Sequence, residues 1–284
     1  PEAPASTTVI TRDMIRQHGY RSLAEILGGV RGFTTSSDGS YTYVGVRGIL
    51  RPGDYNSRVL LMVDGHRLND AVYDGALAGN EGQIDLEMIE RVEITRGPGS
   101  SVYGANAMLA VVNILTRQAR SIQGSEGGIE LDTKGLRRAR VATAGRWAGA
   151  EAVFSVSSAS RKGQGMMAFE NTPAGDTPAN WHAPYLDGER FQRAFLNFAW
   201  RDVTLAAGYS ERHKDIPTAP YATEPGVPGT SVRDQRAWVS LSGHHEFDAS
   251  NEIRGRIAID RYRYHGNYVY RDEDSGQPYT GRDD

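Results

Sequence analysis

The sequence predicts an α+β domain, a small mixed sheet with short helices, followed by a series of antiparallel strands. Up to about residue 118, short apolar runs alternate with glycine-rich turns. Beyond Arg120, apolar and polar residues alternate with a period of two, which is typical of half-buried strands. The links between these alternating segments are short and long in turn, as expected where long hairpins stand side by side in one sheet.

The N-terminal residues predict a mobile segment and two capped helices. Residues 1–8 form a Pro/Ser/Thr-rich leader that we expect to be flexible. Thr11 can cap a first helix, which Gly19 would end in a left-handed conformation. Ser22 begins a capping box for a second helix, which two glycines end.

Short segments further along the chain predict the mixed sheet. Val59–Val63 is an apolar run that stops at an Asp-Gly pair, a strong hairpin signal. Residues 84–89 predict a short helical turn, and residues 92–95 and 111–116 predict two more strands. The Arg-Gly-Pro-Gly sequence at residues 96–99 cannot continue a strand, so a turn separates these two.

Composition narrows the class of protein. The 284 residues include no cysteine, so we expect neither a disulfide framework nor a thiolate metal site. Only 39% of the residues are hydrophobic, and no apolar run reaches the length of a membrane helix, which excludes a helical membrane protein. The net charge of −3 offers no basic surface for nucleic acid.

The C-terminal half shows about seven segments of strand periodicity. They lie at residues 129–133, 141–143, 152–157, 193–200, 203–210, 239–242 and 253–260. Tight links are expected near residues 148–149, 201–202 and 248–251, and long links at 161–189, at 214–231 and from 265 onward. A soluble antiparallel sandwich would alternate in the same way, but links that are short on one side and long on the other favour a membrane barrel.

One motif is more specific than this periodicity. Residues 85–104 read Asp-Leu-Glu-Met-Ile-Glu-Arg-Val-Glu-Ile-Thr-Arg-Gly-Pro-Gly-Ser-Ser-Val-Tyr-Gly, and residues 112–116 read Val-Asn-Ile-Leu-Thr. This stretch resembles the plug domain of TonB-dependent outer-membrane receptors. The resemblance implies a plug domain over residues 9–118 and the N-terminal part of an outer-membrane β-barrel over residues 119–284. The barrel would then be truncated at about seven of its roughly 22 strands.

The resemblance also implies a function. Receptors of this family lie in the outer membrane of Gram-negative bacteria and import scarce, bulky nutrients such as ferric siderophores, haem or cobalamin. Their partners are the outer-membrane lipid and TonB, with ExbB and ExbD, which binds an N-terminal box. We see no convincing copy of this box and expect that it lies before Pro1.

The resemblance further implies that three polar loops, at residues 36–43, 51–57 and 70–82, face the outside and contact the substrate. Loops that carry aromatic residues on a rigid sheet usually bind ligands, although these loops could also be plain solvated turns. The candidate substrate-binding residues are Tyr41, Tyr43, Arg51, Asp54, Tyr55, Tyr73 and Asp74.

Two arginines and a glutamate are candidates for holding the plug in the barrel. By family resemblance, Arg47 and Arg96, with Glu93 nearby, would lock the plug against carboxylates of the barrel wall, because a buried charge must be paired. We expect the wall partners to lie beyond Asp284. The alternative is a surface or within-plug pair, for example with Glu90 or Glu93 itself.

The sequence predicts no catalytic residue, no metal ligand, no cofactor and no enzyme. Residues 97–101 are not a phosphate-binding loop, because no lysine and no long helix follow them. His244 and His245 are neighbours on a strand and point to opposite faces, so they cannot easily share an ion. The acidic residues 272–274 could bind calcium, but a solvated loop is the simpler interpretation.

Two other classes of protein stay open at this point. The chain could be a barrel-less periplasmic plug-type binding module or a non-functional fragment, since an open sheet edge is not tolerated in lipid. A secreted β-rich enzyme is a third and more remote class, because no titratable cluster with motif support accompanies the strands.

Overall fold

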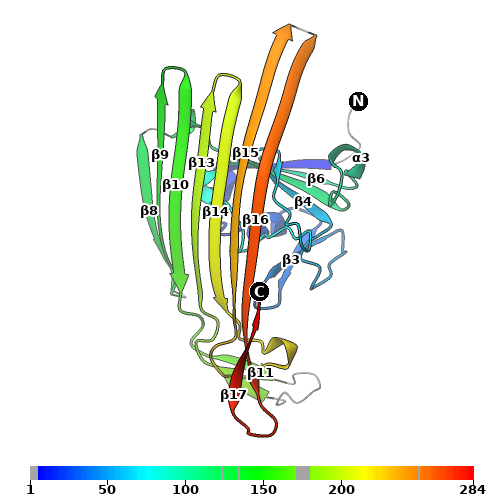
Figure 1. Ribbon diagram of the computed structural model, residues 1–284, viewed down its shortest axis with the longest axis vertical. Helices are drawn as coiled ribbons and strands as arrows, with labels where there is room; N and C mark the ends of the chain where they lie inside the picture. The colour runs from blue at the N-terminus through cyan, green and yellow to red at the C-terminus, as the bar shows by residue number, and fades with distance from the viewer. Residues whose placement is uncertain (1–5, 123, 134, 171–179, 249) are drawn as a thin grey trace.

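The computed structural model describes residues 6–122, 124–133, 135–170, 180–248 and 250–284, and it contains two main sheets. A five-stranded mixed sheet has the order β1-β6-β7-β4-β5, and an eight-stranded sheet has the order β17-β16-β15-β14-β13-β10-β9-β8. Figure 1 shows the second sheet as a tall wall, with the smaller sheet and its helices lying beside it. We call the two parts the plug and the wall.

The plug contains the following elements in chain order: β1 (Ser6–Thr11), α1 (Arg12–His18), α2 (Leu23–Gly28), β2 (Phe33–Ser37), β3 (Thr42–Val46), β4 (Val59–Val63), β5 (His66–Arg67), η1 (Leu86–Met88), β6 (Ile89–Arg96), α3 (Ser100–Tyr103), β7 (Ala110–Thr116) and η2 (Ala119–Ser121). Strands β4 and β7 run parallel while the other neighbours in this sheet are antiparallel. The predicted mixed sheet is therefore confirmed.

Local signals position the first helices as expected. Thr11 is the N-cap of α1 and accepts a hydrogen bond from the backbone N–H of Met14, and Gly19 ends the helix with φ 67°. Ser22 caps α2 by accepting from the N–H of Glu25. Strand β1 begins at Ser6 and pairs with β6, so the end of the predicted 1–8 leader is ordered, whereas residues 1–5 lie outside the described residues.

The β4–β5 hairpin brings a plug loop to the wall. Asp64 and Gly65 have φ values of 47° and 75°, which is the pattern of the tight two-residue turn that suits a twisted hairpin. The Asp64 carboxylate accepts hydrogen bonds from the N–H and hydroxyl of Thr116 in β7, at 2.9 and 2.6 Å. These bonds fasten the turn to the neighbouring strand.

The wall contains β8 (Ser125–Leu131), β9 (Arg137–Trp147), β10 (Ala150–Arg161), β13 (Glu189–Trp200), β14 (Val203–Asp215), β15 (Ser231–Asp248), β16 (Asn251–Arg271) and β17 (Pro278–Asp283), and its longer links contain β11 (Met167–Glu170), β12 (Asn180–Ala183) and η3 (Pro220–Ala222). Tight links join β9 to β10, β13 to β14 and β15 to β16, and Figure 1 shows these at the upper end and the long links at the lower end. The predicted asymmetry of the links is confirmed.

The last part of the wall differs from the prediction. We expected a loop from residue 265 onward, but β16 continues to Arg271 and β17 adds an eighth strand. The continuation was missed because tyrosine fills one face of β16 there, where an alternation of aliphatic and polar residues was the signal sought.

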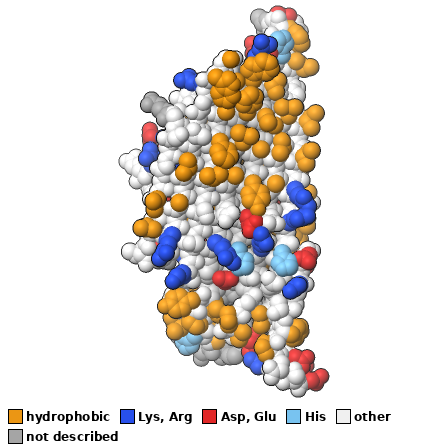
Figure 2. Space-filling view, turned by 60° about the vertical axis from the view of Figure 1, so that its left-hand side comes forward, with side chains coloured by type: hydrophobic (Ala, Val, Ile, Leu, Met, Phe, Trp, Pro, Cys, Tyr) orange, Lys and Arg blue, Asp and Glu red, His pale blue; other side chains and the backbone are white. Residues whose placement is uncertain are grey.

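The two faces of the wall differ in chemistry. Side chains such as Val239, Leu241 and Ile257 are exposed on the face away from the plug, and Figure 2 shows hydrophobic groups covering the upper part of that side. Trp147 and Trp200 are exposed at the tight-link end, where an aromatic girdle is expected. Among the residues that the structure describes, no helix is long and apolar enough to cross a membrane.

The opposite face of the wall packs on the plug. One hydrophobic cluster contains plug residues such as Ile89 and Ile94 together with Val153, Phe195 and Trp238 of the wall. Because a shared core loses apolar contacts when either part is removed, plug and wall stabilise each other.

A close approach in the plug predicts a stability effect. A Cβ atom on Gly45 would lie 2.5 Å from the Thr34 hydroxyl and 2.7 Å from Leu50 Cβ, so one of the neighbours must move. We expect Gly45→Ala to destabilise the protein by about 1–3 kcal/mol, seen as a lower thermal midpoint in detergent. Gly255→Ala is the control, because nothing lies within 4 Å of its added Cβ; equal midpoints for the two variants would contradict this packing.

Candidate functional site

A cavity of about 1120 Å³ lies between the plug loops and the wall. Both parts of the chain contribute aromatic side chains to its lining. The tyrosines that line it are Tyr41, Tyr55, Tyr73, Tyr221, Tyr262, Tyr264, Tyr268 and Tyr270. A concave site with many aromatic faces and a few polar groups is the usual form of a small-molecule binding site.

Three of the seven predicted substrate-binding residues line this cavity. The ring of Tyr55 meets that of Tyr41 edge to face at 5.3 Å and lies 5.4 Å from the ring of Tyr73. Burial raises the pKa of the Tyr55 hydroxyl, so this phenol stays protonated at neutral pH. The structure therefore brings Tyr41, Tyr55 and Tyr73 together, as a single aromatic group on the plug.

The other four predicted residues are not among the described residues that line the cavity, and three of them have partners of their own. Tyr43 is buried and donates to the Asp38 carboxylate at 2.6 Å. Asp54 forms an ion pair with Arg58, and Asp74 forms one with Arg67. The last of the four, the Arg51 side chain, is exposed in its loop.

The wall contributes cavity residues that the sequence analysis missed. Tyr262, Tyr264, Tyr268 and Tyr270 all carry even numbers in β16, so they share the face turned to the plug. A period-two run of tyrosines was the signal that could have revealed them, but this stretch was in large part read as a loop.

Buried arginines of the wall hold the plug through its backbone. Arg193 donates to the carbonyls of Gly82 and Asn80 at 2.8 and 2.7 Å. Arg212 donates to the Ser40 carbonyl and to the Glu189 carboxylate, both at 2.6 Å. A guanidinium has five donors in a fixed fork, and here these donors fix plug loops against the wall.

Arg236 makes the third contact of this kind. It donates to the Leu68 carbonyl at 3.3 Å and pairs with the Asp70 carboxylate at 3.2 Å, and both partners belong to the plug. Nearer the tight-link end, His66 lies 2.9 Å from the Asp260 carboxylate and Arg256 donates to the Asp64 carbonyl at 2.7 Å. Polar contacts thus run along the whole height of the plug.

The proposed lock residues lie elsewhere in the plug. Arg96 donates to the Arg31 carbonyl at 2.6 Å and to the Thr8 hydroxyl at 3.3 Å, and Glu93 pairs with Arg91 at 2.9 Å. Arg47 lies in the turn after β3, with φ 52°. The predicted lock pairs arginines of the plug with carboxylates of the wall. In the contacts described above, arginines of the wall instead donate to carbonyls of the plug.

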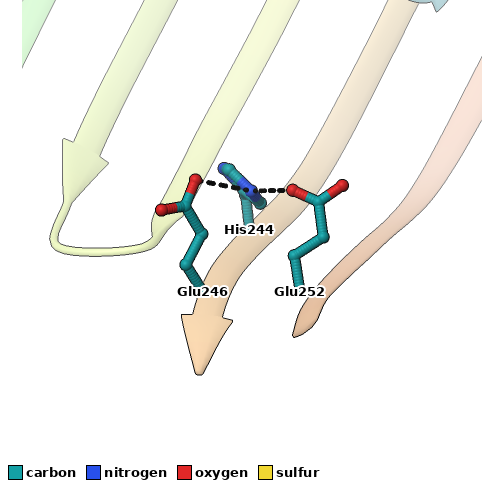
Figure 3. Close-up of side chains that lie close together, drawn as sticks. All are labelled: His244, Glu246 and Glu252. Carbon is teal, nitrogen blue, oxygen red and sulfur yellow. Dashed lines mark hydrogen bonds and ion pairs between the residues drawn. The ribbon is translucent and has the colours of Figure 1, made fainter. Parts of the chain in front are cut away.

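A second group of candidate ligands lies on β15 and β16 near their tight link. His244 lies 3.6 Å from Glu246 and 3.0 Å from Glu252, and Figure 3 shows its ring between the two carboxylates. All three side chains are exposed, and Arg254 also donates to Glu252 at 2.7 Å. His245 turns to Asp202 instead, so the two histidines point apart, as predicted.

Comparison with known proteins agrees with this geometry. A family model described as the TonB-dependent receptor plug domain matches residues 1–111. The vitamin B12 transporter BtuB of Vibrio vulnificus is 36% identical over 124 residues, which cover 44% of this chain and 20% of the transporter. The iron-regulated outer membrane virulence protein of Vibrio cholerae is 33% identical over 135 residues, or 46% of this chain and 20% of that protein.

Solved structures share the fold at low identity. The ferric yersiniabactin uptake receptor FyuA of Yersinia pestis aligns with a TM-score of 0.63 and 18% identity, over 93% of this chain and 42% of FyuA. The ferric-catecholate import receptor Fiu of E. coli aligns with a TM-score of 0.63 and 14% identity, over 99% of this chain and 44% of Fiu. The chain therefore spans less than half the length of the proteins it matches.

Fold and comparisons together define a plug domain that packs on an antiparallel wall of strands, the fold of outer-membrane receptors. Residues 1–111 match the plug domain of TonB-dependent receptors, and the relatives of the chain are outer-membrane proteins. Both the predicted resemblance to this family and the predicted fold class are confirmed.

The arginine contacts predict how firmly the plug is held. Arg193→Ala would leave the part-buried carbonyls of Gly82 and Asn80 without their donor, at a cost of about 1–3 kcal/mol. We expect an increased leak of small solutes across the outer membrane of cells that make the full-length receptor. The control is Arg146→Ala, a change of an exposed arginine near a tight link, and a leak no greater than that of the control would contradict the role of Arg193.

Glu81 predicts a pH dependence of plug stability. This carboxyl is buried and accepts from the N–H of Gly79 at 2.9 Å, and burial raises its pKa. The folded plug therefore binds this proton more tightly than the unfolded chain, and stability falls as the pH rises above the ordinary carboxyl range. Glu81→Gln should be more stable than the wild type at neutral pH and gain nothing near pH 4, measured by thermal unfolding; a less stable variant at neutral pH would refute this.

Proposed function

We propose that the whole protein is a TonB-dependent receptor that actively imports a scarce, bulky nutrient through the outer membrane. In this proposal residues 9–118 form the plug domain and residues 119–284 form the N-terminal part of the barrel. The role of this chain is to supply the plug, together with the first part of the wall that binds the substrate and holds the plug.

The cavity between plug and wall is the observation that carries the proposal. Its volume of about 1120 Å³ lies slightly above the usual size range of ligand sites, which suits a bulky compound. It lies among plug loops and residues next to the long links of the wall, such as Tyr221 and Tyr268. In this class of protein the long links face the outside of the cell, where the nutrient arrives.

The substrate class that we propose is a ferric siderophore, haem or cobalamin. The relatives support the siderophore and cobalamin classes, because they include a vitamin B12 transporter and receptors for ferric yersiniabactin and ferric catecholates. The eight tyrosines of the lining offer flat faces that can stack on the aromatic or macrocyclic parts of such ligands.

The proposed energy source is TonB, acting with ExbB and ExbD on an N-terminal box ahead of the plug. A pull on β1 would be transmitted to β6, because the two strands are paired from Ser6 to Thr11. Substrate passage then requires part of the plug to move or unfold. The pulling force would convert an ordered plug segment into a disordered one. The contacts of Arg193, Arg212 and Arg236 with plug carbonyls are those that such a movement would break.

The lock of Arg47, Arg96 and Glu93 stays part of the proposal. These residues belong to the plug, and we propose that Arg47 and Arg96 meet carboxylates of a wall segment other than the eight strands described here. A barrel-less binding module is the less favoured alternative, because Val153, Phe195 and Trp238 of the wall share one buried cluster with the plug.

Uptake by living cells tests the proposed function. A Gram-negative strain without other receptors would produce the full-length protein and be supplied with a labelled ferric catecholate, a ferric hydroxamate, haem or cyanocobalamin. We expect accumulation of at least one compound, and its loss in the same strain without TonB. Uptake that persists without TonB, or no uptake of any of the four, would overturn the proposal.

The aromatic group on the plug predicts a binding defect. Replacing Tyr55 and Tyr73 by alanine removes two of the three plug rings that line the cavity, and each lost aromatic contact weakens binding severalfold or more. We expect the Kd of the imported compound to rise about tenfold or more, measured on purified receptor in detergent. Tyr103→Ala, which changes an exposed residue of α3, is the control; an unaltered Kd in the double variant would remove these loops from the site.

A further inference from the structure

One buried carboxylate lies behind two tyrosines of the cavity. Asp234 in β15 is 2% exposed and is not among the residues that line the cavity. Tyr41 of the plug donates its hydroxyl hydrogen to Asp234 at 3.0 Å, and Tyr262 of β16 donates to the same carboxylate at 2.8 Å. A plug residue and a wall residue thus share a single acceptor under the cavity.

The hydroxyl hydrogens are committed by this arrangement. A phenol has one hydrogen to donate and can accept in addition, whereas an ionised carboxylate only accepts. The hydrogens of Tyr41 and Tyr262 must therefore point to Asp234, away from the cavity, and burial raises the pKa of the Tyr41 hydroxyl so that it remains protonated. What these two tyrosines can offer a substrate is their ring surfaces and oxygen lone pairs.

The neighbouring arginines direct their hydrogen bonds elsewhere. Arg212 lies 3.7 Å from Asp234 and donates to Glu189 and to the Ser40 carbonyl. Arg236 lines the cavity and stacks on the Tyr262 ring at 4.3 Å, and its hydrogen bonds go to the plug. The hydrogen bonds of these two cations thus go to Glu189 and to the plug.

One further tyrosine pair uses a hydroxyl hydrogen internally. Tyr264 and Tyr268 share a hydrogen bond between their hydroxyls, so one of these two hydrogens is occupied by the partner. Among the tyrosines of the lining, Tyr41 and Tyr262 form a floor on which both hydroxyl hydrogens are committed to Asp234.

We propose that Asp234 determines substrate specificity, by positioning Tyr41 and Tyr262 as hydrogen-bond acceptors and ring surfaces. The inference rests on the proposed import function and narrows its substrate class. The end of the substrate that reaches this floor carries hydrogen-bond donors, as hydroxyl, amide N–H or ammonium groups do. A substrate that presents bare carboxylate or phosphate oxygens to these two phenols finds no hydroxyl donor on them and is disfavoured, because its oxygens lose water without a new partner there.

Two matched probes test the specificity. The first is the ferric complex of desferrioxamine B, which ends in a primary ammonium group, and the second is the same complex with that amine succinylated to a carboxylate. The full-length receptor in detergent should bind the ammonium form more tightly. Asp234→Asn should lower the ratio of the two affinities about tenfold. The substitution replaces one carboxylate oxygen, which lies 3.2 Å from the Tyr41 hydroxyl, by an amide N–H2 group that donates to a phenol oxygen, so that this phenol can turn its hydrogen into the cavity.

The control is Asp260→Asn, which changes a wall carboxylate that contacts His66 and is not part of the cavity lining. An unchanged ratio in Asp234→Asn, or an equal change in the control, would overturn the inference. Failure of the wild type to bind either complex would also count against it. The proposed function would survive that result if cells still import haem, cobalamin or a ferric catecholate in a TonB-dependent way.

A spectroscopic measurement separates orientation from fold. In ultraviolet resonance Raman spectra, the intensity ratio of the tyrosine doublet depends on whether the hydroxyl donates or accepts. Asp234→Asn should shift this ratio away from donation in a background that retains Tyr41 and Tyr262, and the shift should vanish when both are phenylalanine. A shift that persists without these two phenols would show that Asp234 acts on the overall fold instead.

Discussion

Buried guanidinium groups of the wall that donate to backbone carbonyls of the plug are the constraint on which the structure depends. Arg193, Arg212 and Arg236 reach across the interface to carbonyls in two plug loops, the one after β2 and the one after β5. A buried charge without partners is costly, and carbonyls in loops are available only while those loops keep their conformation. The same bonds therefore shape the loops, seat the plug and set the work needed to move it.

The candidate binding site is built on this interface. Tyr41 and the Ser40 carbonyl are neighbours in one plug loop, and they contact Asp234 and Arg212 of adjacent wall strands. A ligand that moves Tyr41 therefore also moves the neighbouring Ser40 carbonyl, which Arg212 of the wall binds. Binding and retention of the plug share side chains here, which is the physical requirement for one to influence the other.

The wall serves two environments because its side chains alternate. Trp238 turns inward to the plug core while Val239 is exposed on the outer face, and His244 and His245 part in the same way. A shift of the register by one residue would exchange these faces. The continuous pairing from β8 to β16 therefore decides both what faces the plug and what faces the membrane.

The sequence by itself determined the local features: the caps at Thr11 and Ser22, the Asp64 turn, most wall strands and the family motif at residues 85–104. Each depends on neighbours close in the chain, so composition and spacing are sufficient to reveal it. Only the tertiary structure decided that Tyr41 and Tyr262 share Asp234, since these residues are far apart in the sequence and meet through strand register and docking of the plug. It also decided that wall arginines bind plug carbonyls, because backbone acceptors carry no signature in the sequence.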